Sequence, residues 1–162
     1  MKKITFILFA LIAGTGFAQT NIASATVDVD VVSVITIQKD VDLNFGKIIS
    51  DVDGGTVIIN LDSSRGAGTA NYVTTGAIPT AASFTIAAET GYYYSIAYTS
   101  SATLAGPSGS VPMGVVYSYS LPTANNLGGT DTNLLVGGTL SVGSNQLVGN
   151  YTGSVEVTVA YE

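Results

Sequence analysis

The stretch Gly149-Asn-Tyr-Thr-Gly-Ser-Val-Glu-Val-Thr-Val-Ala-Tyr-Glu162 alternates between apolar and polar residues almost without interruption. One face carries Tyr151, Val155, Val157, Val159 and Tyr161, and the other carries Thr152, Ser154, Glu156, Thr158 and Glu162. Side chains of a β-strand point alternately to opposite faces, so this stretch predicts a strand with one buried and one solvated face. A strand this regular needs a partner on each side, or it leaves an open edge.

The beginning of the sequence has the pattern of a secretory signal peptide. Lys2 and Lys3 precede an apolar run over residues 4–13, and small residues lead to Ala18. This pattern predicts cleavage after Ala18 and export of the remaining chain, through the periplasm to the cell surface or the medium. We expect no membrane span in the mature chain, because no later apolar run approaches about 20 residues.

The composition of the mature chain argues against several classes of function. Removing Lys2 and Lys3 takes the formal net charge from −6 to −8, which disfavours nucleic acid as a partner. The sequence contains no histidine and no cysteine, so the usual pairs of nucleophile and base are absent. We therefore expect no enzymatic activity and no cofactor.

The remaining pattern is that of an all-β protein. Valine, isoleucine, threonine and tyrosine are frequent, and no helical spacing of apolar residues follows residue 18. Strands are expected at residues 31–38, 56–61, 82–87, 92–98, 113–120, 134–142 and 149–162, with short elements at 43–48 and 71–75. Residues 100–112 and 121–133 are expected to be loops, and Gly137-Gly138 to mark a bulge or a close backbone approach. About seven to nine strands without helices favour an antiparallel β-sandwich over residues 31–162.

Residues 19–30 precede this domain as a separate arm. Ala23, Ala25, Val27 and Val29 fall on one face, and the opposite face carries Ser24, Thr26, Asp28 and Asp30. From Val31 to Ile37 the pattern becomes apolar on both faces, which predicts a buried domain strand.

Two further groups of residues are candidate binding sites. Asp51-Val-Asp53-Gly-Gly resembles the first half of a calcium loop, but the remaining oxygen ligands are missing, so a turn is favoured and no metal site is predicted. The tyrosines at 92–94, 98, 117 and 119 favour core packing with an exposed aromatic row. The alternative is a platform for a glycan or another ligand.

The chain resembles a family of exported bacterial domains of unknown function. The resemblance is carried by residues 43–48, 55–59, 82–86, 136–140 and 151–161. The C-terminal stretch also resembles the end of chaperone–usher pilus subunits, with Gly149, alternating valines and Tyr161 next to last. The second resemblance implies an immunoglobulin-like sandwich that lacks its last strand.

What the pilus resemblance implies is a structural subunit of an adhesive cell-surface fibre, or fimbrium. A periplasmic chaperone, and later the arm of a neighbouring copy or related subunit, would supply a strand, and an outer-membrane usher would assemble the fibre. The expected donor face comprises Ala23, Ala25, Val27, Val29 and Val31, and the expected acceptor edge comprises Gly149, Tyr151, Val155, Val157, Val159 and Tyr161. The chain departs from many pilins in having no disulfide and in placing alanines on the donor face. The alternatives are a self-complete surface or matrix sandwich, in which residues 21–30 pair within their own domain, and a secreted glycan-binding module.

Overall fold

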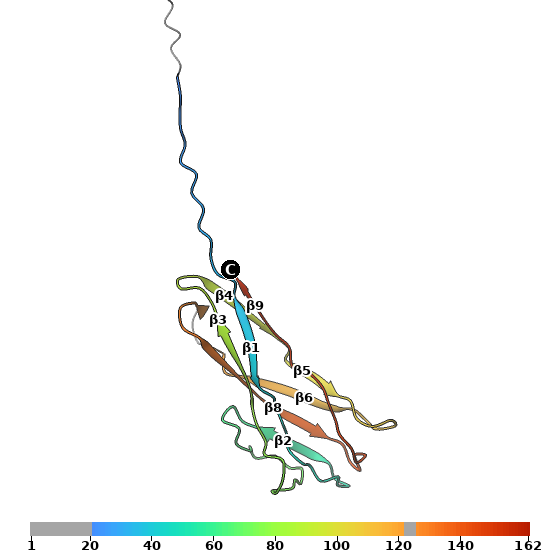
Figure 1. Cartoon of the computed structure of the whole chain (residues 1–162). Helices are drawn as coiled ribbons and strands as arrows, with labels where there is room; N and C mark the ends of the chain where they lie inside the picture. The colour runs from blue at the N-terminus through green and yellow to red at the C-terminus, as the bar shows by residue number, and fades with distance from the viewer. Residues whose placement is uncertain (1–20, 122–125) are drawn as a thin grey trace, which may run out of the picture. The chain divides into compact units, whose positions relative to one another are not determined.

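The computed structural model describes residues 21–121 and 126–162 (Figure 1). Its compact unit comprises residues 32–162, and residues 21–31 belong to a separate segment. The predicted signal peptide lies outside the described residues. The described ranges contain strands and no helix, and so no helix that could cross a membrane.

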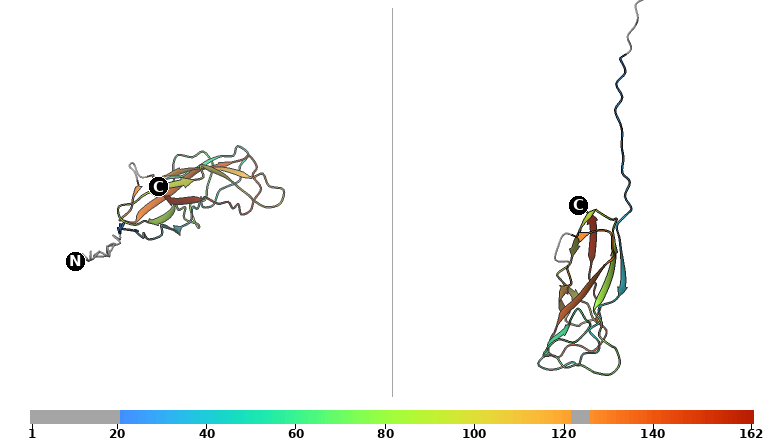
Figure 2. Two further views of the ribbon diagram at one scale, coloured as in Figure 1. Left: turned by 90° about the horizontal axis from the view of Figure 1, so that it is seen from above. Right: turned by 90° about the vertical axis from the view of Figure 1, so that its left-hand side faces the viewer.

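The described residues form nine strands in an antiparallel, immunoglobulin-like β-sandwich, as the sequence predicts. The strands are β1 (Thr36–Val41), β2 (Gly55–Ile59), β3 (Ala82–Ala87), β4 (Tyr93–Tyr98), β5 (Ser101–Leu104), β6 (Met113–Tyr119), β7 (Asn126–Leu127), β8 (Thr132–Val142) and β9 (Val157–Tyr161). One sheet has the order β1-β3-β8-β6-β5, with β2 also pairing with β8, and the other has the order β7-β4-β9. Figure 2 shows these strands from two further directions.

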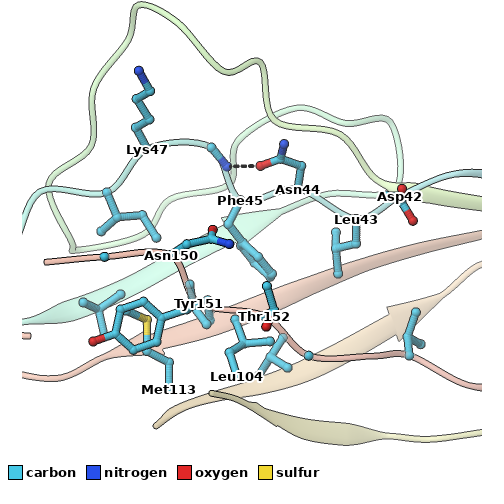
Figure 3. Close-up of a pocket in the computed structure, with 18 of the residues that line it drawn as sticks. Asp42, Leu43, Asn44, Phe45, Lys47, Leu104, Met113, Asn150, Tyr151 and Thr152 are labelled. Carbon is cyan, nitrogen blue, oxygen red and sulfur yellow. Dashed lines mark hydrogen bonds between the residues drawn. The ribbon is translucent and has the colours of Figure 1, made fainter. Parts of the chain in front are cut away.

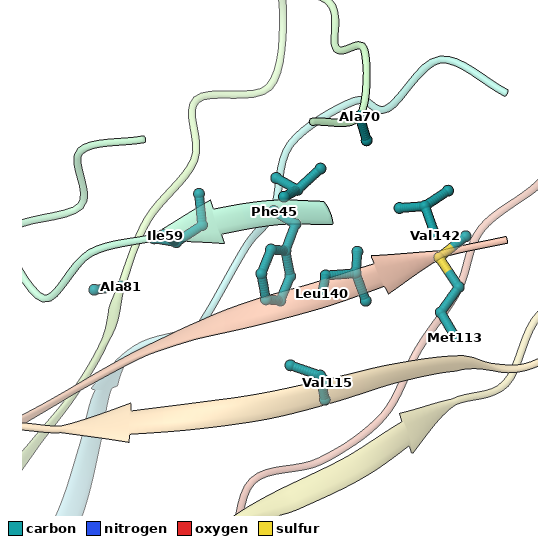
Figure 4. Packing of buried hydrophobic residues seen from close by; sticks show 9 residues of the cluster. Phe45, Ile59, Ala70, Ala81, Met113, Val115, Leu140 and Val142 are labelled. Atoms are coloured by element: carbon teal, nitrogen blue, oxygen red, sulfur yellow. The ribbon is translucent and has the colours of Figure 1, made fainter. Parts of the chain in front are cut away.

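The longest strand, β8, organises the core because it contributes to both apolar clusters. Leu134 and Val136 pack in one cluster with Phe84 and Ile86 of β3, and the side chains of Leu134 and Val136 are completely buried. The C-terminal half of β8 packs in the other cluster, together with Val57, Ile59, Met113 and Val115. Figure 4 shows this second cluster, with the ring of Phe45 lying over β8 beside Leu140.

The glycine pair at Gly137-Gly138 lies where β8 changes its partner. On one side β8 pairs with β3 up to Val136 and with β2 from Gly138 onward, while its pairing with β6 continues through both glycines without a bulge. A Cβ at Gly137 would lie 2.4 Å from the carbonyl oxygen of Ile59. Of the two predicted alternatives, the close backbone approach is therefore correct and the bulge is wrong.

The start of the first domain strand was predicted wrongly. β1 begins at Thr36, and Val31 and Val34, which the pattern placed in a buried strand, are 86% and 80% exposed. The physical reason is the length of its partner, because Thr36 is in register with Ala87, the last residue of β3. Residues before Thr36 have no β3 residue to pair with.

Two expected loops contain strands, and two expected strands are shorter than predicted. Residues 100–112 include β5, which pairs with β6, and residues 121–133 include β7, which pairs with β4. The weak strand expected at 71–75 is a single bridge between Ile48 and Tyr72. The final strand is continuous only from Val157, and Thr152 forms an isolated bridge with Ala105.

Candidate functional site

The predicted acceptor face lies on one side of β9 and of the segment that leads into it. Val155, Val157, Val159 and Tyr161 pack against the Leu134–Val136 cluster, yet each of these side chains is only half-buried. The alternate residues, including Glu156 and Thr158, are exposed. The apolar face of β9 is thus covered on the inside by the core and is incompletely covered at its edge.

The main chain of β9 is paired on one side. Glu162 N–H donates to the carbonyl of Tyr93, and the carbonyl of Glu156 accepts from Thr99 N–H. On the same side of the chain, Thr152 and Ala105 exchange two main-chain hydrogen bonds of 2.8 Å. Successive residues of a strand point their main-chain groups to opposite sides. The N–H and C=O groups of Val157 and Val159 therefore point to the side away from β4.

That unpaired side faces β1, the edge strand of the other sheet (Figure 1). Cα atoms of β1 and β9 approach within 8 Å, but the two strands form no ladder. The hydroxyl of Tyr161 donates to the carbonyl of Ser33 at 3.1 Å and accepts from Glu89 N–H at 2.8 Å. These two hydrogen bonds close one end of the gap between β1 and β9, which we call the seam.

The other described sheet edges are covered or short. Gly66 and Ala70 donate main-chain hydrogen bonds to β2 and so cover its edge. Just after the end of β5, Ala105 forms a bridge with Thr152. β7 has two residues. Exposed edges invite pairing with other chains, and proteins commonly shorten or cover them. In the described part of the chain, the seam between β1 and β9 is one long open edge, and β4 beyond Tyr94 is a second, shorter one on the side of β7.

The seam widens into a cavity of about 980 Å³ beside the segment that precedes β9 (Figure 3). One wall is the segment from Leu43 to Ile48, and the other runs from Gln146 to Val155. Leu104, Met113, Val115 and Leu140 contribute to its lining. Figure 3 shows Phe45 and Tyr151 projecting from opposite walls. The cavity thus has a mixed lining, in which apolar side chains predominate over polar ones such as Lys39, Asp42 and Asn150, and segments far apart in the sequence supply it.

The predicted Gly149 lines this cavity. A Cβ at this position would come within 2.2 Å of the Pro107 ring, so glycine allows the loop to pass Pro107 closely. Next to it, Leu147 and Val148 are exposed while they line the cavity. The buried side chain of Gln146 donates to the hydroxyl of Tyr151 at 2.9 Å and accepts from Gly143 N–H. These bonds fix the wall from which Tyr151 projects.

Sequence reasoning missed Arg65, which supports the opposite wall. Its Nη2 atom donates to the carbonyl of Phe45 at 2.8 Å, and its guanidinium carbon lies 4.0 Å from the centroid of the Tyr72 ring. Its Nη1 atom is buried and has no hydrogen-bond partner among the described residues. Gly46 adopts a φ of 74°, and a Cβ there would lie 2.7 Å from Nη2. Arg65 and Gly46 therefore fit each other closely behind Phe45.

Replacing Arg65 with lysine is expected to destabilise the sandwich. Lysine lacks the planar guanidinium group, so it loses both the bond to Phe45 and the stacking on Tyr72. We expect a loss of about 1–2 kcal/mol in the free energy of unfolding, measured by urea denaturation. Lys47→Arg, at an exposed position on the same wall, is the control and should change stability by less than about 0.5 kcal/mol. Equal stability of Arg65→Lys and the unchanged chain would contradict the supporting role.

The candidate calcium turn is built as a hydrogen-bonded turn. Asp51 Oδ1 accepts from Asp53 N–H, and Asp51 Oδ2 accepts from Asn71 Nδ2 at 2.6 Å. The described residues contain no group of three or more side chains of the types that hold a metal ion. The hydrogen bond from Asn71, followed by those from main-chain N–H groups, lowers the pKa of the Asp51 carboxyl group.

Asn71→Ala is expected to raise the pKa of Asp51 back toward its ordinary value. The stabilisation from a lowered carboxyl pKa is present above the pKa of the unfolded state and is lost as the pH falls through the folded-state pKa. The variant should therefore lose less stability than the unchanged chain over this acidic range. An NMR titration of the Asp51 carboxyl carbon measures the shift, and Asp62, whose pKa is lowered by Ser64, should not change. An unchanged Asp51 pKa would contradict the assignment to Asn71.

The candidate tyrosine platform is divided between core and surface. Tyr94 is buried and donates to Thr132, whereas Tyr92 and Tyr93 are exposed. The hydroxyls of Tyr117 and Tyr119 donate to the carbonyls of Ser154 and Thr99, and burial raises the pKa of both side chains. Tyr98 packs on Tyr119 with 4.1 Å between ring centroids. Most of these rings therefore have structural partners within the sandwich.

The predicted donor face lies outside the compact unit. Residues 21–31 contain no strand, and the side chains of Val27, Val29 and Val31 are at least 85% exposed. None of the five predicted donor residues therefore belongs to either sheet of the sandwich.

The fold and the seam define a class, the antiparallel β-sandwich with one open seam between its two sheets. A model of the family described as "Domain of unknown function (DUF4402)" matches residues 35–161, and the chain belongs to that family. The predicted membership in a domain family of unknown function is thereby confirmed. No curated protein and no solved structure matches the chain. The likeness to chaperone–usher subunits stays a prediction.

Proposed function

We propose that the chain is a structural subunit of an exported fibre that assembles by donor-strand complementation. Residues 21–31 of one copy would lie in the seam of the next copy and pair with β9. The observation that carries the proposal is the one-sided pairing of β9, whose unpaired main-chain groups and half-buried apolar face lie along the seam, with the cavity beside the segment that precedes β9. An added strand would satisfy the main-chain groups and cover the apolar side chains together.

The arm has the composition that this site requires. Its alternation presents Val27, Val29 and Val31 on one face and Asp28 and Asp30 on the other. The valines are exposed in the single chain, so burying them in a neighbour would contribute about 25 cal/mol per Å² of apolar area. The contact is heterologous, because the arm of one copy meets the seam of another, and such contacts extend into fibres.

The same edge is the expected binding site for partners before assembly. A subunit with an unpaired edge would need a carrier that covers the edge of β9 during export, such as the periplasmic chaperone expected from the sequence. An outer-membrane usher would then exchange the carrier for the arm of the next subunit. The final location would be the cell surface.

Val27→Asp tests the proposal, with Ser24→Asp as the matched control. Both variants add one carboxylate to the arm, but Val27 belongs to the inward face and Ser24 to the outward face. An unpaired buried carboxylate is costly, so Val27→Asp should lose assembly while Ser24→Asp keeps it. Sedimentation velocity and electron microscopy of the purified mature chain measure fibre formation. Equal assembly of both variants, or an unchanged chain that stays monomeric at high concentration, would contradict the proposal.

A further inference from the structure

The two ends of the open seam differ in width. At the Tyr161 end, β1 and β9 approach each other and the Tyr161 hydroxyl bonds to Ser33. At the other end, beside Tyr151 and Val155, the walls separate around the cavity. Two strands that flank a third lie about 9.5 Å apart. A strand docked along the whole seam would therefore have to move β1 away from β9 in the narrow half, while the wide half already contains the cavity.

The arm has a matching gradient of side-chain size. Its apolar face begins with Ala23 and Ala25 and continues with Val27, Val29 and Val31. We propose that the valine half of the arm enters the cavity of a second copy, and that the alanine half lies between β1 and β9 next to Tyr161. This inference rests on the proposed function and assigns the direction and register of the docked arm. It also accounts for the alanines, since they lie where the seam is narrow.

The direction that follows is antiparallel to β9. Every strand pairing in the described structure is antiparallel, so an antiparallel addition continues the existing pattern. The arm, residues 21–31, and the edge, residues 151–161, have equal lengths. Aligned end to end in opposite directions, they place Val31 opposite Tyr151 and Val27 opposite Val155.

This register also separates like charges. Asp28 faces Ser154 and Asp30 faces Thr152, so neither acid lies opposite Glu156. Moving the arm toward Tyr161 by two residues places Asp28 opposite Glu156, and moving it by four places Asp30 there. Like charges directly opposite each other destabilise a strand pair, so the charges oppose these two shifts. Moving the arm by one residue would turn the apolar face outward.

The same direction would keep the donor's domain away from the end where the acceptor's own chain enters its sandwich. The compact unit starts beside Tyr161, because Ser33 bonds to that side chain. In the proposed direction the donor's domain follows Val31 and lies at the cavity end of the acceptor. The acceptor's own chain enters its compact unit at the opposite end, where Ser33 lies beside Tyr161. The reverse direction would place the donor's domain where the acceptor's own chain enters the sandwich.

Disulfide trapping tests the direction. The sequence contains no cysteine, so only the introduced cysteines can form a disulfide. One full-length variant carries Ser24→Cys and Thr158→Cys, which face each other in the proposed register. A second variant carries Ser24→Cys and Ser154→Cys, which face each other in the reverse direction, or in an antiparallel register shifted by four residues, but not in the proposed register. Opposite Cα atoms lie about 4.5–5.5 Å apart, within the range of a disulfide, while a four-residue offset adds about 13 Å. Ser24→Cys alone is the control.

After mild oxidation, the first variant should give a ladder of covalent oligomers on non-reducing gels. The second variant and the control should give no species larger than a dimer. A ladder from the second variant alone, or from both, would overturn the proposed alignment of direction and register while leaving arm docking intact. Fibres without a ladder in either variant would overturn the register, whereas chains that stay monomeric would contradict the proposed function itself.

Discussion

Deleting residues 19–30 is expected to abolish fibre assembly and to leave the sandwich folded. The six largest fully buried side chains, Ile59, Ile86, Val115, Leu134, Val136 and Leu140, all lie in the compact unit. The deletion removes none of the contacts that bury them. We expect a change in the free energy of unfolding below about 1 kcal/mol, together with the loss of sedimenting fibres.

A self-complete sandwich predicts the opposite result. If residues 21–30 paired within their own domain, their deletion would remove a strand and lower the melting temperature sharply. A synthetic peptide of residues 19–31 separates the two accounts further. Added to the shortened chain at about 100 times its dissociation constant, it should stabilise the fold by about 2.7 kcal/mol. A peptide with Val27 and Val29 replaced by aspartate should not.

Gly137→Ala is expected to cause the largest loss of stability among single methyl additions in the sheet. The new Cβ would lie 2.4 Å from the main-chain oxygen of Ile59, and the main chain cannot move aside as a flexible side chain can. Accommodating it requires β8 and the end of β2 to separate. We expect a cost on the order of 3 kcal/mol, or about 10 °C in melting temperature by calorimetry.

Gly114→Ala is the matched control on the neighbouring strand β6. No atom lies within 4 Å of a Cβ at this position, and its backbone does not require glycine. This variant should be neutral or slightly more stable, since alanine reduces the freedom of the unfolded chain. Equal stability of the two variants would show that the close approach at Gly137 is not a constraint on the fold.

Strands with strict alternation were predictable from the sequence. β3 has the predicted bounds, with Phe84 and Ile86 inward, and the face of Val155, Val157 and Val159 follows the predicted alternation. β5 and β7 were not predictable, because a short polar strand has no pattern that distinguishes it from a loop. The run from Val31 to Val34 was misleading, since an apolar stretch has the same composition whether its own domain or another molecule covers it.

The candidate site was only partly predictable. The alternating face of β9 is a local property, so the sequence contains it. The cavity is not local, because Phe45, Leu104, Met113 and Tyr151 meet only after the sheets have packed. The support of Phe45 by Arg65 was missed for the same reason, although a lone arginine among apolar and small residues is a weak signal for a structural role.

Hydrogen exchange of the β9 amides tests the central claim most directly. In the unassembled chain, the amides of Thr158 and Ala160 point toward β4 and should exchange slowly, while those of Val157 and Val159 point toward the seam and should exchange fast. In fibres, Val157 and Val159 should become as protected as their neighbours, and amides of residues 21–31 should gain protection with them. Slow exchange of Val157, Val159 and residues 21–31 in the isolated monomer would contradict the account, because the seam would then be filled by the chain's own arm.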